Sequence, residues 1–237
     1  MIPSLIVAAA VQAGLDIIGI ADHNSCENAG SVVDAAAGSG LKVLAGLEAQ
    51  SMEGVHLLCL FDTVEQAECL QSAIYESLPT PSPGGEGWGE GDVGRLRRVY
   101  GEQLIVDSSD EFVGYCERQL AFPSSLSIDD IWNRVSIMGG IVIPSHIDRR
   151  STGLCDVLGM VPDQPDFPAV EISRNLTPTE ARAIYPSIGS RAIICNSDAH
   201  WLSAIGERRT TFYLEHRRVS EIPMACRCEA GRRVCHA

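Results

Sequence analysis

Seven side chains that can bind a metal ion or move a proton lie on or just after separate apolar runs of this sequence. They are Asp22 and His23 at the end of "GLDIIGIADHNS", Glu48, His56, His146, and Asp198 with His200 in "NSDAH". Imidazole and carboxylate ligands together suit zinc, manganese or iron. A carboxylate can also bridge two ions, and two ions roughly 3.5–4 Å apart form a common phosphoester-cleaving arrangement. One histidine at such a position is more often structural, but four together favour a metal site.

Nucleophile chemistry and phosphate-loop binding fit the sequence less well. No G-x-S-x-G motif is present, and no cysteine lies in a nucleophile motif. The segment "GSGLK" at 38–42 is a short glycine turn, because a phosphate-binding loop needs G-x-x-x-x-G-K-[ST]. The nine cysteines are irregularly spaced, and Cys59 and Cys195 lie inside apolar runs. We therefore expect small buried hydrophobic residues in a reducing compartment, not a disulfide framework.

The elements that must position these side chains alternate along the chain. Strands are expected at 16–22, 43–48 and 55–61 and in "IVIPSH", "AVEIS" and "AIICNSD", with helices at 4–13, 27–37 and 64–77. This alternation favours an α/β fold with a mostly parallel sheet or barrel. Barrel enzymes place their sites at the carboxyl ends of the strands, which is where the polar residues lie here.

Helix start signals support this division. Ser4 is expected to cap the first helix, with Gly14 as its stop. In "SIDDIWNRVSIMGG", Ser127 stands three residues before Asp130, and in "TPTEARAIY" Thr177 precedes Pro178 and Glu180. The chain thus opens on a helical pattern, whereas an α/β barrel normally begins with a strand. We expect an unusual topology or a missing first strand.

Two segments break the pattern. Residues 79–94, "PTPSPGGEGWGEGDVG", are rich in Pro, Gly and Glu and are expected to form a flexible surface insertion. The tail 224–237, "MACRCEAGRRVCHA", could be a zinc knuckle, but its irregular Cys spacing favours a disordered end. The expected domain is therefore 1–223, followed by a disordered tail.

Composition bounds the possible partners. At 237 residues and 45% hydrophobic content, the chain suits one globular domain with a sizeable core. A net charge of −13 argues against stable nucleic-acid binding, although a short or transient nucleotide substrate stays open. No run reaches transmembrane length, and the opening lacks the positive leader of a signal peptide. We expect a cytoplasmic protein without a membrane partner.

Four segments in order resemble the motifs of the PHP family, named for polymerase and histidinol phosphatase domains. They are "DIIGIADHNS", "GLEAQSMEGVHLLCLF", "GGIVIPSHIDR" and "NSDAH", and the match runs from about residue 5 to 215 without the 79–94 insertion. The resemblance implies a distorted (β/α)7 barrel. It also implies up to three divalent ions (zinc, manganese or iron) at the strand ends, and phosphoesterase activity by attack of a metal-bound hydroxide.

Carried over by position, the resemblance assigns a role to each candidate. Glu48 bridges two ions, His56 and His146 complete the second ion's site, His23 and His200 serve a third ion, and Asp198 serves the first. Glu48, Asp198 and Asp22 are the expected catalytic residues, with Asp22 either orienting its neighbour or serving a purely structural role. Arg149 and Arg174, just past strand ends, are candidates to hold a substrate phosphate. For each arginine a surface salt bridge is an equal alternative.

The chain departs from the family at its start. The family opens with a strand carrying a D-x-H-x-H type motif, which this sequence lacks. The first ion then lacks two histidines and the third lacks a ligand, so fewer ions are expected. We expect a phosphoesterase acting on a small phosphorylated metabolite or nucleotide, with impaired activity. The alternatives are an inactive metal-binding or structural remnant, and a nuclease or polymerase-associated module.

Overall fold

Four strands form the largest sheet of the protein. The computed structural model describes residues 1–79 and 103–235. The sheet contains β1 (Ile17–His23), β2 (Lys42–Gln50), β3 (His56–Phe61) and β6 (Ile141–Pro144), hydrogen-bonded in that order. β1 and β2 are parallel, whereas β3 is antiparallel to both β2 and β6. The fold is mixed α/β, and the expectation of a mostly parallel sheet is wrong for these strands.

The connection between β2 and β3 explains the antiparallel pair. Only residues 51–55 join the two strands, and they form a turn in which the Ser51 N–H donates to the Val55 carbonyl at 2.9 Å. A parallel pair would need a crossover of a dozen or more residues. The apolar runs of the sequence predict where β2 and β3 lie, but the shortness of the link between them determines that the two strands are antiparallel.

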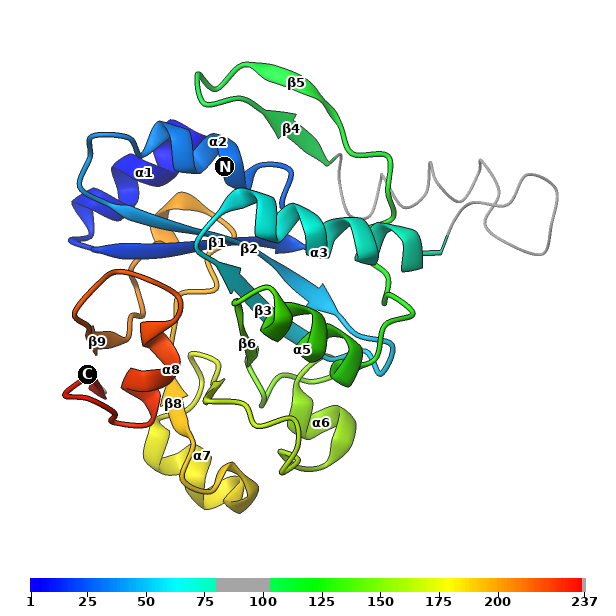
Figure 1. Cartoon of the computed structure of the whole chain (residues 1–237), viewed down its shortest axis with the longest axis vertical. Helices are drawn as coiled ribbons and strands as arrows, with labels where there is room; N and C mark the ends of the chain where they lie inside the picture. Colours follow the sequence, from blue (N-terminus) through cyan, green and yellow to red (C-terminus); the bar gives the residue numbers. More distant parts are fainter. Residues whose placement is uncertain (80–102, 236–237) are drawn as a thin grey trace, which may run out of the picture.

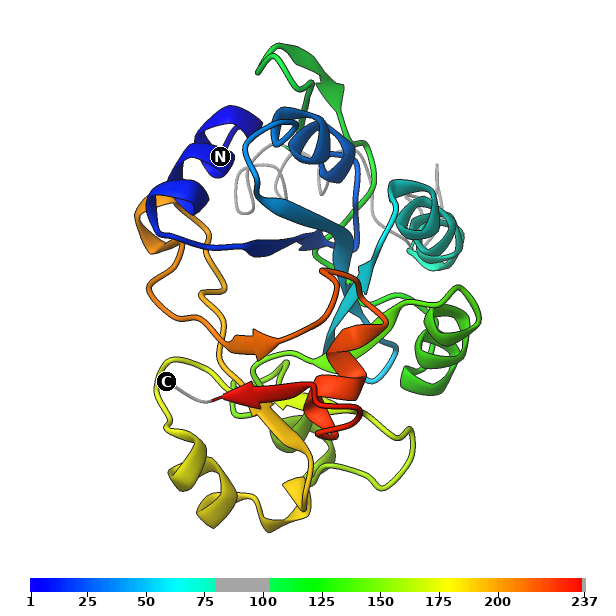
Figure 2. The same cartoon turned by 60° about the vertical axis from the view of Figure 1, so that its left-hand side comes forward.

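Helices cover the outside of this sheet (Figure 2). They are α1 (Pro3–Gln12), α2 (Ala29–Ala35), α3 (Val64–Ser77) and α5 (Ile128–Ile137). The expected Ser127–Asp130 capping box is confirmed, and α3 begins with a similar box at Thr63 and Gln66. Ser4 does not cap α1, because the helix already begins at Pro3 and the Ser4 hydroxyl donates to Asp110 instead.

The second half of the chain forms smaller sheets. β7 (Ala169–Glu171) and β8 (Ala192–Ile194) are parallel, and β9 (Thr211–Tyr213) and β10 (Arg233–Cys235) are antiparallel. Short helices precede or separate these strands. α6 (Leu154–Leu158) comes before β7, and the others lie between β7 and β10: α7 (Pro178–Ile184), the 3₁₀ turns Pro186–Ile188 and Leu202–Ala204, and α8 (Glu221–Cys226). The Thr177–Glu180 capping box of α7 is confirmed. Across the described residues, the strand ladders do not close into a ring, so the (β/α)7 barrel stays a prediction.

A hairpin projects beyond α2 (Figure 1). It consists of β4 (Leu104–Val106) and β5 (Phe112–Tyr115), and the Asn28 side chain fastens it by bonds to the Leu104 carbonyl and the Val106 N–H at 3.0 and 3.1 Å. Residues 80–94 of the expected insertion lie outside the described part of the chain.

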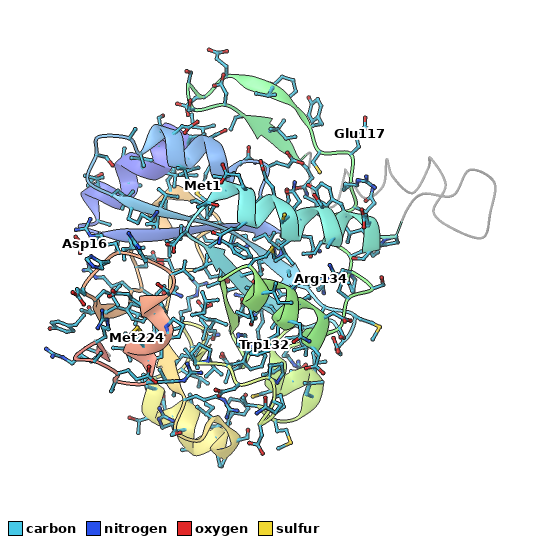
Figure 3. All side chains as sticks on the ribbon, viewed as in Figure 1. Met1, Asp16, Glu117, Trp132, Arg134 and Met224 are labelled. Carbon is cyan, nitrogen blue, oxygen red and sulfur yellow. The ribbon has the colours of Figure 1, made fainter. Side chains whose placement is uncertain are left out.

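The C-terminal segment is structured up to residue 235, contrary to the expectation of a disordered tail. Met224, labelled in Figure 3, lies on α8, whose Ala225 is fully buried. β10 adds to β9, and Val234 packs against the core of β6 and β8. The Arg232 side chain is 14% exposed and pairs with Glu215 and Glu221. The ion pairs of Arg232 and these apolar contacts offset the loss of conformational entropy that ordering the segment requires.

The core lies between the sheet and its helices. Residues 43–49 of β2 are all buried, and Leu47, Leu57 and Phe61 are completely inaccessible to solvent. Cys59 is also fully buried, as expected, and Cys195 is partly buried. Among the described residues, none of the helices has the length and apolarity that a membrane crossing requires.

Candidate metal centre

The carboxyl end of β2 places Glu48 at the centre of a histidine cluster. In the β1–β2 register, His23 lies directly opposite Glu48. Across the β2–β3 ladder, Glu48 faces Leu58 and Gln50 faces His56. Because side chains two residues apart on a strand share a face, His56 and Glu48 project to the same side. His146 arrives from the end of β6, two residues after Pro144, which pairs with Leu57.

Three imidazoles contact the Glu48 carboxylate. Oε2 lies 3.0 Å from His23 Nδ1 and 3.1 Å from His56 Nδ1, and Oε1 lies 3.2 Å from His146 Nε2. The ring of His56 lies 5.1 Å from that of His23 and 5.3 Å from that of His146, between centroids. One ligand atom from each of His23, Glu48 and His56 falls within 4.8 Å of the others. Four expected ligands therefore meet in one place.

Buried histidine nitrogens without hydrogen bonds show that this cluster suits a cation. Neither ring nitrogen of His146 has a hydrogen-bond partner of good geometry among the described residues, and the same holds for His56 Nδ1. His146 and His56 are only 2% and 7% exposed. Leaving such groups unpaired costs about 1–3 kcal/mol each, so buried examples call for an explanation. A divalent ion bound by these nitrogens and Glu48 would supply their missing partner.

The cluster holds Glu48 as an anion. Burial opposes its ionisation, but the close approach of His146, His23 and His56 outweighs burial and holds the pKa of Glu48 well below its ordinary value. The hydrogen bond to Glu48 in turn raises the pKa of His23, against the effect of burial. An ionised carboxylate among imidazoles is the donor set that zinc, manganese and iron accept.

Strained backbone and a buried amide support the cluster. Asn24, which follows His23, is fully buried and has a φ of +52°. Its Nδ2 donates to the carbonyls of Leu120 and Phe122 at 3.0 Å, and its Oδ1 accepts from the Gln50 N–H at 2.8 Å. His146 and Asp198 also have positive φ values, +30° and +46°. Such conformations persist where the surroundings fix them, and they gather at functional sites.

The loop after β6 is fixed at several points. The His56 N–H donates to the Thr152 carbonyl at 3.0 Å, and Asp148 accepts from the Ser173 N–H at 2.7 Å. At Gly153, an added Cβ would lie 2.5 Å from the Arg149 carbonyl oxygen, so the turn closes too tightly for a side chain. This turn carries both His146, aimed at Glu48, and Arg149.

Asp198 and His200 lie at the open rim of the site. The Asp198 side chain is 30% exposed and that of His200 is 53% exposed. Asp198 Oδ2 accepts a hydrogen bond from Arg149 Nη2, and His200 Nδ1 lies 3.8 Å from Asp198 Oδ1. The His200 ring reaches to 6.2 Å from that of His23, between centroids. Both residues thus border the Glu48 cluster without joining it.

Two candidates lie away from the cluster. Asp22 alternates with His23 along β1, and its carboxylate accepts from Asn28 Nδ2 at 3.4 Å. Arg174 is exposed, and its backbone carbonyl accepts a hydrogen bond from Arg208 Nη2 at 2.8 Å. The structure therefore brings together His23, Glu48, His56 and His146, with Asp198, His200 and Arg149 at their rim, but it does not bring in Asp22 or Arg174.

Glu171 is a site residue that the sequence reasoning missed. It ends β7, is 6% exposed, and its carbonyl accepts from the N–H of Ile147, the neighbour of His146. Burial, with the nearby charges of Glu48 and Asp198, raises the pKa of Glu171 to about 8. The available signal was the one that identified Glu48: a lone acidic residue at the end of an apolar strand.

Comparison with solved structures shows a shared fold. Endonuclease Q from Pyrococcus furiosus matches with a TM-score of 0.66 at 17% identity, covering 99% of this chain and 53% of that one. Endonuclease Q in complex with a 27-mer duplex substrate, with an abasic lesion at the active site, matches with a TM-score of 0.67 at 16% identity, covering 98% and 53%. This chain thus spans about half the length of these proteins.

A smaller protein also matches. A candidate metal-dependent phosphoesterase from Bifidobacterium adolescentis has a TM-score of 0.52 at 18% identity, with 94% of this chain and 88% of that chain covered. No family model and no curated protein sequence matches the chain.

The expectation of no stable nucleic-acid binding is contradicted by this comparison. A structure whose fold covers 98% of this chain was solved with a duplex DNA substrate. The argument from a net charge of −13 fails because net charge sums the whole surface. A bound strand meets the local field of the site, where metal ions can offset carboxylates.

Proposed function

We propose that the chain is a metal-dependent phosphoesterase of the PHP type, built on a distorted (β/α)7 barrel. The single observation that carries the proposal is the Glu48 carboxylate, faced by three imidazoles, two of which, His56 and His146, have buried nitrogens without hydrogen-bond partners of good geometry among the described residues. The fold shared with a candidate metal-dependent phosphoesterase supports it. All nine cysteines are free, which supports a reducing compartment such as the cytoplasm.

Each residue of the site has a proposed part. His23, Glu48, His56 and His146 would hold a divalent ion, which when bound supplies Lewis acidity and a coordinated water of lowered pKa. Glu48 stays ionised because its three histidines lower its pKa. Asp198, His200 and Arg149 lie at the exposed rim, where a phosphate group can reach them. The buried apolar residues of β2 and β3 exclude water from the side of the site that faces the core.

Assays with simple esters test this proposal. Purified protein supplied with Mn²⁺ or Zn²⁺ is expected to hydrolyse p-nitrophenyl phosphate or bis-p-nitrophenyl phosphate. Activity should disappear with a chelator and return with the metal. Hydrolysis that resists the chelator, or a metal-loaded protein that cleaves neither ester nor any oligonucleotide, would reject the function.

Cleavage of a nucleic-acid strand is the second candidate, alongside a small phosphorylated metabolite. The match to Endonuclease Q over 98–99% of this chain favours it. A labelled duplex with one abasic position, the same duplex without it, and its single strands separate the possibilities on a denaturing gel. Lesion-dependent cutting would identify the nuclease. Ester hydrolysis with all three oligonucleotides intact would favour a small substrate.

A further inference from the structure

Asp198 has a side-chain cation as its partner. Arg149 Nη2 donates to Asp198 Oδ2, while the Glu48 carboxylate is turned toward imidazoles. Among residues 1–79 and 103–235, the compact group of metal-ligating atoms consists of His23, Glu48 and His56, without Asp198. The ligands of the site are thus divided between an imidazole-rich pocket and an acidic position already neutralised by arginine.

The site needs positive charge at this position. The charges of two carboxylates, Glu48 and Asp198, act on a third, the buried Glu171. Burial, followed by the charges of Glu48 and Asp198, raises the pKa of Glu171, and the Arg149 charge acts in the opposite direction. An exposed pair is worth little alone, but a cation beside several partly buried carboxylates is held by all of them.

Arg149 lies on a hydrogen-bonded turn between His146 and Gly153. Its N–H donates to the His146 carbonyl at 2.8 Å, and its own carbonyl accepts from the Gly153 N–H at 2.9 Å. The same turn directs His146 to Glu48 at 3.2 Å. The backbone of Arg149 is therefore fixed relative to the histidine cluster, and Asp198 holds the guanidinium, while the side chain remains 41% exposed to an entering phosphate.

We propose that Arg149 supplies, as a built-in cation, the positive charge that a second metal ion would supply at Asp198, so that the site takes a single divalent cation. The inference rests on the proposed function, since it concerns the same site. Guanidinium matches both carboxylate and phosphate oxygens through its fork of donors. Arg149 can therefore neutralise Asp198 at rest and share its free donors with a substrate phosphate.

Titration of metal-free protein with Mn²⁺ by calorimetry, with metal content counted in parallel, tests the proposal without any substrate. We expect about one Mn²⁺ per wild-type chain, held by the imidazole–carboxylate set. Arg149→Gln should bind the first Mn²⁺ roughly threefold or more tightly, because a nearby positive charge is gone. It should also gain a weaker second ion at Asp198, which the double variant Arg149→Gln/Asp198→Asn should lose.

Two controls separate charge from structure. Arg149→Lys keeps the charge and should keep about one ion with little change in affinity. Arg150→Gln removes an exposed charge from the neighbouring position and should change the Mn²⁺ affinity less than about twofold. Thermal unfolding of each variant confirms that it is folded before titration.

The outcomes are distinct. About two or more Mn²⁺ in the wild type, or weaker first-ion binding in Arg149→Gln, would overturn the role of Arg149 while leaving the metal-dependent function intact. A single ion in Arg149→Gln with unchanged affinity would overturn it as well. A wild-type chain that binds no Mn²⁺, Zn²⁺ or Fe²⁺ would remove the proposed function and this inference together.

Discussion

At the scale of single residues, chemistry is concentrated where the strand register places it. Glu48 meets His23 because the two are direct partners in the β1–β2 ladder. It meets His56 because that residue lies on the same face of the neighbouring strand. His146 completes the cluster from a loop of positive φ. The sheet itself therefore places Glu48 and two of its three histidines.

Replacement of Glu48 tests the role of the anion. Glu48→Gln keeps the shape but removes the charge, so divalent affinity should fall by more than the roughly 10–100-fold that loss of an outer-shell partner costs. Equilibrium dialysis with Mn²⁺ measures the change. Glu76→Gln, which replaces an exposed carboxylate on α3 by the same carboxamide, is the matched control and should bind Mn²⁺ like the wild type. Equal affinity in both variants would show that the ion binds elsewhere.

Asn24 should matter for stability. Asn24→Ala removes the side-chain hydrogen bonds to the Leu120 and Phe122 carbonyls and from the Gln50 N–H, and it puts alanine at a φ of +52°. The free energy of unfolding should fall by about 3 kcal/mol. Urea denaturation measures it, with Asn175→Ala at an exposed position as the control. A loss no larger than that of the control would mean that the 120–122 segment is held by other contacts.

Residue patterns predicted most of the ligands but not their grouping. Polar residues after apolar runs identified His23, Glu48, His56 and His146, because strand ends converge at one edge. Asp22 was assigned to the site by its neighbourhood in sequence, yet alternation along β1 turns it toward Asn28. Glu171 was missed because its meaning depends on the carboxylates of β2 and the 198–200 loop, which only tertiary structure brings near.

At the scale of elements, close backbone approach shapes the sheet. At Gly46 in β2, an added Cβ would lie 2.2 Å from the Cys59 carbonyl oxygen and 2.8 Å from Leu60 Cδ2. Gly46→Ala should therefore lower the free energy of unfolding by about 3 kcal/mol or prevent folding. Gly30→Ala in α2 meets only Val64 at 3.5 Å and should be neutral or slightly stabilising. Equal denaturation midpoints for the two variants would contradict this packing.

Local signals predicted elements better than their assembly. Capping boxes at Ser127 and Thr177 formed as expected, because they need only neighbours along the chain. The direction of β3 and the order of the C-terminal segment depend on distant contacts. Residues 224–235 look too polar to fold alone, but Arg232 forms ion pairs with Glu221 and Glu215, and β10 pairs with β9. The sequence of the segment itself does not predict these contacts.

The Arg232–Glu221 pair should make stability depend on acid pH. A hydrogen bond from Arg232, with others from the backbone of His216 and Glu215, lowers the pKa of Glu221 from 4.5 to about 2. A lowered carboxyl pKa stabilises the fold above the unfolded-state value, and this contribution is lost as pH falls from 4.5 to about 2. Glu221→Gln should be less stable than the wild type at neutral pH.

Urea denaturation across this range measures the difference between the two proteins. The gap between wild type and Glu221→Gln should shrink as the pH falls through the window. Glu229→Gln, an exposed substitution in the same segment, should show no such gap. A constant gap from neutral to acid pH would attribute the loss to packing and not to ionisation.

At the scale of the whole molecule, overall charge and local charge diverge. The chain carries a net charge of −13, yet its fold is shared with an Endonuclease Q structure that holds duplex DNA. The acidic sum includes exposed helix and hairpin residues, whereas the site gathers four imidazoles and one guanidinium around its carboxylates. Composition therefore excludes less than it first indicates.

The central claim is that a divalent ion binds at Glu48. Anomalous diffraction from a crystal soaked in Mn²⁺, collected on both sides of the manganese absorption edge, tests it most directly. The account predicts a dominant anomalous peak within coordination distance of the Glu48 carboxylate and the ring nitrogens of His23, His56 and His146. An absence of density there at saturating Mn²⁺, with the three imidazoles still in contact with Glu48, would contradict it.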